Sequence, residues 1–95
     1  MTAYVIFETK ALQDKEQLEK YKELAVPSIT QYGGKFLIGP GKTRVIEGDH
    51  VDYVVCLTFD TFEQAETWYE SPEYQAAKKL REGIADVNAL IVEGM

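Results

Sequence analysis

The strands that this sequence predicts carry apolar side chains on both faces, and this feature constrains the fold more than any other. Residues 3–9, 52–59 and 86–93 are rich in aromatic and β-branched types. Neighbours such as Val5 and Ile6, which point to opposite faces of a strand, are both apolar. A sheet with one face in water alternates apolar and polar residues instead. Both faces of this sheet therefore need cover.

A long helical pattern follows the first strand. Asp14 predicts an N-cap, and apolar residues then recur at three- and four-residue spacings on one face of the helix: Leu18, Tyr21, Ala25, Ile29 and Tyr32. Gly33-Gly34 predicts the left-handed stop of this helix. Pro27 lies inside the pattern, so we expect a kink or a new first turn near Val26.

A second helical region follows the third strand. Thr61 predicts an N-cap, and Gln64 three residues later completes a capping-box pattern. Ser71-Pro72 predicts a helix restart, because serine caps helices and proline is favoured at the first helical position, with Glu73 in the positive first turn. Two helical pieces are therefore expected here.

The second strand begins at Lys35–Ile38, is interrupted by Gly39-Pro40-Gly41 and is expected to resume through Thr43–Ile46. The predicted order is therefore β-α-β-β-α-β, with residues 1–95 forming one α+β domain of the ferredoxin-like class and a four-stranded antiparallel sheet. Right-handed crossover helices cover one face of such a sheet. The other face is most economically covered by the same face of a second chain, so we expect a homodimer.

Composition narrows the partners. The net charge is −6 and the basic residues are scattered among acids, so no concentrated positive face is available for nucleic acid or an anionic membrane. The N-terminus does not resemble a signal peptide, which favours the cytoplasm. Cys56, the only cysteine, lies in an apolar strand and is expected to be a small buried hydrophobe. No metal site or cofactor is predicted.

The strongest candidate for ligand contact is the aromatic group Trp68, Tyr69 and Tyr74 around the helix restart. Large amphipathic rings beside a backbone break either line a cavity or staple two helical pieces to the sheet. Aromatic residues at helical spacing are usually core. Both interpretations stay open.

Three further residues are candidates for polarity in a ligand site: the phenol of Tyr32, the cation of Arg44 and the lone histidine His50. Each also has a simpler interpretation as a solvated surface group, since no second ligand or orienting partner is evident. Arg81, on the second helical region, has the same two interpretations.

Several motifs resemble the bacterial domain-of-unknown-function family 1330, over nearly the whole chain. They are Tyr32-Gly33-Gly34-Lys35-Phe36-Leu37, Glu47-Gly48-Asp49, Phe59, Trp68-Tyr69-Glu70-Ser71-Pro72-Glu73-Tyr74-Gln75 and Leu80-Arg81. The resemblance implies membership of the dimeric α+β barrel superfamily, whose members pair ferredoxin-like sheets face to face. Relatives in that superfamily include cofactor-independent monooxygenases and ligand-sensing domains, but a shared fold does not transmit function.

Three functions are therefore compared. The first is a cofactor-independent enzyme acting on a small apolar or aromatic metabolite in a cleft between helices and sheet. The second is a non-catalytic small-molecule-binding or stress-associated module, and the third is a purely structural dimer. A cavity with two or more convergent polar groups favours the first, a dry apolar cavity the second, and no cavity the third.

Overall fold

The structure, a computed structural model, describes all residues from 1 to 95. Four strands form one antiparallel sheet in the order β2-β3-β1-β4, and three helices complete the chain. This is the predicted ferredoxin-like α+β fold. The elements are β1 (Ala3–Lys10), α1 (Lys15–Gln31), β2 (Lys35–Ile38), β3 (Tyr53–Phe59), α2 (Phe62–Tyr69), α3 (Pro72–Arg81) and β4 (Asp86–Glu93).

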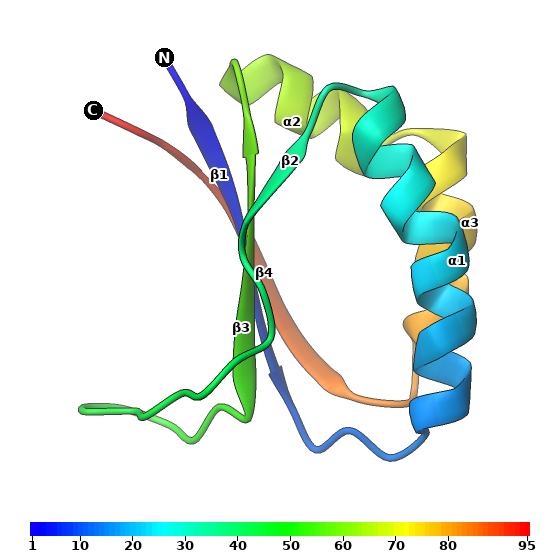
Figure 1. Cartoon of the computed structure of the whole chain (residues 1–95), viewed down its shortest axis with the longest axis vertical. Coiled ribbons are helices and arrows are strands. Elements are labelled where there is room, and N and C mark those ends of the chain that lie inside the picture. Colours follow the sequence, from blue (N-terminus) through cyan, green and yellow to red (C-terminus); the bar gives the residue numbers. More distant parts are fainter.

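All three helices lie on one side of the sheet (Figure 1). On β1 the side chains of Val5 and Phe7 face this helical layer and are buried, whereas Tyr4 and Ile6 on the opposite face are only half-buried. Only one of the two apolar faces is therefore covered within one chain. The inner face meets helices, and the outer face meets none (Figure 1).

The predicted helix signals at α1 are present. The side chain of Asp14 accepts a hydrogen bond of 3.0 Å from the Gln17 amide. α1 continues as one helix through Pro27, so no new helix begins near Val26. Gly34 follows the end of the helix, and a Cβ atom there would lie 2.6 Å from the Phe59 ring, which only glycine avoids.

The restart after α2 also follows the prediction. Thr61 and Ser71 each accept a hydrogen bond of 3.1 Å, from the amides of Gln64 and Tyr74 respectively. The capping box at Thr61 is only half formed. The Gln64 side chain donates instead to the Tyr32 carbonyl, at 2.7 Å, and so ties the end of α1 to the start of α2.

The predicted continuation of the second strand is wrong. β2 ends at Ile38, and residues 43–46 belong to no strand. The β2–β3 register shifts between Phe36 and Ile38, and Pro40, two residues further on, has no N–H to donate to a ladder. Residues 39–52, here called the arm, leave the sheet, and the tip of this segment projects on the side away from the helices (Figure 1).

The outer face of the sheet is apolar and open. Ile38, Leu90 and Val92 are exposed, and Cys56, which is paired with Ile38 in the strand register, is buried as predicted. Burial raises the pKa of the Cys56 thiol. None of the helices combines the length and the apolar character needed to cross a membrane.

Candidate functional site

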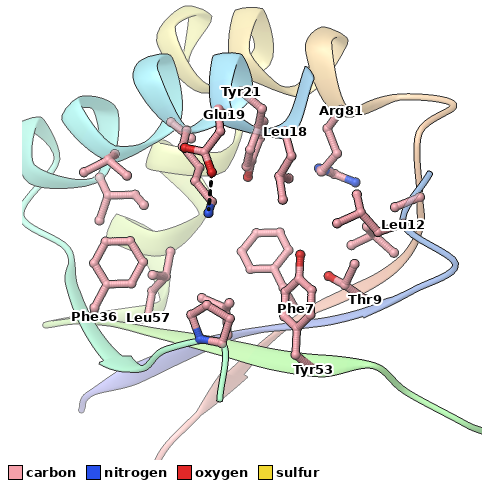
Figure 2. Close-up of a pocket in the computed structure, with 18 of the residues that line it drawn as sticks. Phe7, Thr9, Leu12, Leu18, Glu19, Tyr21, Phe36, Tyr53, Leu57 and Arg81 are labelled. Atoms are coloured by element: carbon pink, nitrogen blue, oxygen red, sulfur yellow. Dashed lines mark hydrogen bonds and ion pairs between the residues drawn. The ribbon is translucent and has the colours of Figure 1, made fainter. Parts of the chain in front are cut away.

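A cavity of about 480 Å³ lies between the helical layer and the sheet. Phe7 and Leu57 form its floor on β1 and β3, and Leu18 and Tyr21 of α1 form its roof (Figure 2). Val55, the partner of Phe7 in the strand register, also lines the cavity. Of its 20 lining residues 14 are hydrophobic, so the cavity offers an apolar ligand a favourable exchange of water for hydrocarbon.

The sizes of the lining side chains explain where the cavity opens. Thr9, Ala25 and Ala85 contribute small side chains to its wall. At the other end of the layer between helices and sheet, the large side chains of Trp68 and Phe59 fill the gap between the two layers and are fully buried. The helices therefore pack tightly at one end and leave room for a ligand at the other.

One polar end of the cavity is formed by Arg81, the last residue of α3. Its guanidinium carbon lies 6.0 Å from the centre of the Phe7 ring and 5.8 Å from that of Tyr21. The side chain points from the helical layer into the cavity (Figure 2). Its one hydrogen bond within the chain, to the Tyr74 hydroxyl, is long at 3.4 Å, and its buried Nε has no partner.

Tyr21 and Tyr74 join this polar end. Their hydroxyl oxygens lie 3.0 Å apart, and their rings meet edge to face with centroids separated by 6.2 Å. Tyr74 is fully buried, whereas Tyr21 lines the cavity. Burial, followed by the neighbouring Tyr74 hydroxyl, raises the pKa of Tyr21 far above its usual range, so Tyr21 stays a protonated donor.

The remaining polar groups of the cavity lining include two hydroxyls on the sheet side and an exposed ion pair on α1. Thr9 and Tyr53 bring two further hydroxyls to the cavity wall (Figure 2). Glu19 and Lys22 also line it, and they pair with each other at 3.4 Å on exposed side chains. The inner polar end therefore presents donors, and the one carboxylate of the cavity wall is already paired with a lysine.

Of the aromatic candidates, Trp68 alone touches the cavity. Its N–H donates to the Ser28 hydroxyl at 3.0 Å, and its ring packs 4.3 Å from the Tyr74 ring, centroid to centroid. It thus staples α2 to the core and also supplies one wall of the cavity. Tyr74 lies one layer deeper, and Tyr69 packs against Tyr74 with Lys78 above its ring.

Tyr32 lies on the surface at the end of α1, away from the cavity lining. Its hydroxyl donates to a carboxylate oxygen of Glu73 at 2.9 Å, and this bond raises the pKa of Tyr32. Gln31 donates to the other carboxylate oxygen at 3.2 Å. The group joins the end of α1 to the start of α3.

Arg44 and His50 lie on the arm, where they line a polar groove on the outer side of the sheet. His50 Nε2 is 2.7 Å from Asp52 Oδ1, and this hydrogen bond lowers the pKa of Asp52. The other oxygen of Asp52 accepts the Ala11 amide at 2.9 Å. The six residues predicted to bind a ligand therefore do not converge on one place, and their role stays a prediction.

Two residues outside that predicted set, Tyr21 and Arg81, form the polar end of the cavity. The sequence assigned Tyr21 to the core face of its helix. One signal could have singled out Arg81: it continues the inward stripe of Tyr74 and Ala77 on α3, so a cation stands on an otherwise buried face.

The fold and the cavity between its two layers define a small ferredoxin-like α+β protein. The chain belongs to the family described as "Domain of unknown function (DUF1330)", whose model matches residues 2–95. The resemblance drawn from the sequence motifs is thereby confirmed. Among curated proteins none matches this sequence.

Solved structures share the fold. A protein of unknown function from Rhodopseudomonas palustris, RPA0582, is 16% identical with a TM-score of 0.78, over 99% of this chain and 82% of that one. A dimeric ferredoxin-like protein from Jannaschia is 11% identical with a TM-score of 0.68, over 99% and 100%. SnoaB, a cofactor-independent oxygenase from Streptomyces nogalater, is 11% identical with a TM-score of 0.61, over 99% and 91%. At these identities the likeness establishes the fold alone.

Proposed function

We propose that this protein is a cytoplasmic homodimer that binds a small apolar or aromatic metabolite in the cavity of each subunit and acts on it without a cofactor. The observation that carries the proposal is the 480 Å³ cavity, apolar over most of its wall, with Tyr21 and Arg81 converging at one end. Ligand pockets commonly measure about 300–1,000 Å³ and combine apolar walls with a few placed polar groups.

The convergence of two donors supports an enzyme. Donors held in advance within a low-dielectric cavity stabilise negative charge that develops on a substrate during reaction. One structural relative is described as a cofactor-independent oxygenase. The cavity itself argues against a purely structural dimer.

The second candidate is a non-catalytic binding module, and a different observation favours it. The cavity lining contains no histidine or aspartate, and its one glutamate, Glu19, is paired with Lys22. A proton-abstracting reaction would need the base to come from the substrate or from water. Binding without turnover is the outcome expected under this alternative.

Dimerisation through the outer face of the sheet is supported by its exposed apolar side chains and by relatives described as dimeric. Leu90→Glu would place a charge at a residue that is 40% exposed on that face. We expect light scattering to show a monomer. Leu24→Glu, on α1 and 46% exposed, is the control and should remain dimeric. A dimeric Leu90→Glu variant would disprove this interface.

The cavity is tested by filling it. Leu18→Trp inserts a large ring into the lining, and Leu24→Trp places the same ring on the same helix outside it. Indole, 2-naphthol and phenylacetate, titrated by calorimetry, should bind the wild type and Leu24→Trp but not Leu18→Trp. Equal binding to both variants would show that the ligand site lies elsewhere.

Turnover distinguishes the two candidate functions. Each compound that binds is incubated with the protein in air-saturated buffer and followed by mass spectrometry. Conversion that Leu18→Trp abolishes would support the enzyme. Binding without conversion would leave the binding module.

A further inference from the structure

The hydrogen bonds at the polar end of the cavity have a defined direction. Arg81 can only donate, so the Tyr74 oxygen accepts from it. Tyr74 is fully buried, and the one acceptor within reach of its own proton is the Tyr21 oxygen, 3.0 Å away. If Tyr21 donated to Tyr74 instead, the Tyr74 proton would be buried without a partner, which is costly.

This direction leaves one donor free. Arg81 donates to Tyr74 and Tyr74 donates to Tyr21, so the Tyr21 proton has no acceptor in the chain. Tyr21 lines the cavity, and the free proton is therefore available to a bound molecule. The cavity end that looks like a closed cluster is a donor site.

Arg81 also lacks a partner, because no carboxylate in the chain pairs with its positive charge. The chain contains two side-chain ion pairs, Lys22–Glu19 and His50–Asp52, and neither involves Arg81. Its positive charge rests on the faces of Phe7 and Tyr21, with Nε buried and unpartnered. A half-buried cation normally has a carboxylate partner, because desolvation of an unpaired charge is unfavourable.

We propose that the cavity selects a small apolar carboxylate, whose oxygens accept hydrogen bonds from the Arg81 guanidinium and the Tyr21 hydroxyl. This inference rests on the proposed cavity function and adds the chemical class of the ligand. The carboxylate supplies both the missing counter-charge and the missing acceptor. The apolar body of the ligand then lies between Leu18 above and Phe7 and Val55 below.

The same geometry disfavours neutral analogues. A primary amide of identical shape presents an NH₂ group to a site made of donors and brings no charge to Arg81. The cavity should therefore discriminate at the head group and tolerate variation in the apolar body, where contact is nonspecific.

The experiment compares acids with their amides by calorimetry on the intact dimer. Phenylacetate, 2-naphthoate and indole-3-acetate are each paired with the corresponding primary amide. We expect each acid to bind the wild type at least about tenfold more tightly than its amide, as charge-assisted hydrogen bonds require. Arg81→Gln should remove this preference while amide binding changes little.

Matched variants isolate the two donors. Lys79→Gln removes one positive charge from the exposed face of the same helix turn and should leave the acid preference intact. Tyr21→Phe should reduce it by about threefold to tenfold, since one hydrogen bond is lost. Thermal unfolding confirms that each variant is folded, and Arg81→Lys, which keeps the charge but loses the planar fork, should retain part of the preference.

The outcomes separate the inference from the proposed function. Equal binding of acids and amides to the wild type would overturn the carboxylate inference and leave the cavity function standing. A preference unchanged in Arg81→Gln would overturn it as well. If no acid and no amide binds, and indole and 2-naphthol do not bind either, the proposed function itself fails.

Discussion

The two ends of the layer between helices and sheet differ in whether their buried polar groups have hydrogen-bond partners within the chain. At the packed end, formed by Trp68, Phe59 and Ser28, the tryptophan N–H donates to the Ser28 hydroxyl, and Ser28 in turn donates to a backbone carbonyl at 2.6 Å. At the open end, beside the cavity, Arg81 keeps a buried Nε without a partner.

The difference separates structural from functional polarity. A buried polar group that the chain itself satisfies contributes to a unique packed core. A buried polar group without a hydrogen-bond partner in the chain lowers stability. Proteins retain such groups mainly where a ligand supplies the missing partner. The packed end should therefore lose stability when its polar or aromatic groups are removed, whereas the open end should lose binding.

The largest effect is expected at Trp68. Trp68→Ala empties the centre of the packed end and should lower the free energy of unfolding by about 3–5 kcal/mol. Urea denaturation at fixed protein concentration measures it, because dimer stability depends on concentration. Phe36→Ala, at a half-exposed ring of β2 that lines the cavity, should cost about 1 kcal/mol or less. Similar losses at both sites would contradict the distinction between the two ends.

A smaller loss is expected at Ser28. Ser28→Ala keeps the helix but leaves the Trp68 N–H buried without an acceptor, at a cost of about 1–3 kcal/mol. Thr67→Ala removes an exposed hydroxyl that also bonds to its own helix and should stay within about 0.5 kcal/mol of wild type. Chemical denaturation compares the three proteins, and a neutral Ser28→Ala would refute the role of this hydrogen bond.

At the open end, a substitution should raise the free energy of unfolding rather than lower it. Arg81→Met replaces an unpaired cation by an apolar side chain of similar length, so the free energy of unfolding should rise by about 1 kcal/mol. Lys79→Met, on the exposed face of α3, should change it by less than about 0.5 kcal/mol. Clear destabilisation by Arg81→Met would show that Arg81 is a structural residue.

Much of the fold could be predicted because local signals and burial agree. The bounds of β4 follow from its apolar run, and Asp14, Thr61 and Ser71 cap the helices that they predict. The segment 43–46 misled the prediction because its β-branched residues favour strand conformation. A strand also needs a neighbouring strand to pair with, and intrinsic strand propensity does not predict whether the tertiary structure supplies one.

The site was less predictable for the same physical reason. Trp68 was identified by residue type, but Tyr21 and Arg81 are 60 positions apart and meet only because α1 packs beside α3 (Figure 1). Tyr21 shares its spacing with ordinary core residues. The direction of its hydrogen bond depends on the burial of Tyr74, which no periodicity reveals.

The smallest effect is expected at Glu73, which opens α3 at the packed end just as Arg81 closes the same helix at the open end. Its own backbone N–H, then the Tyr32 hydroxyl, lower the pKa of Glu73. A carboxylate with a lowered folded-state pKa stabilises the fold above its unfolded pKa of about 4.3, and this contribution is lost as the pH falls through the folded value. Glu73→Gln should therefore shift the urea midpoint slightly at about pH 7 and not at about pH 3. A shift of equal size at both values would show that the carboxylate charge is not what Tyr32 and the helix start recognise.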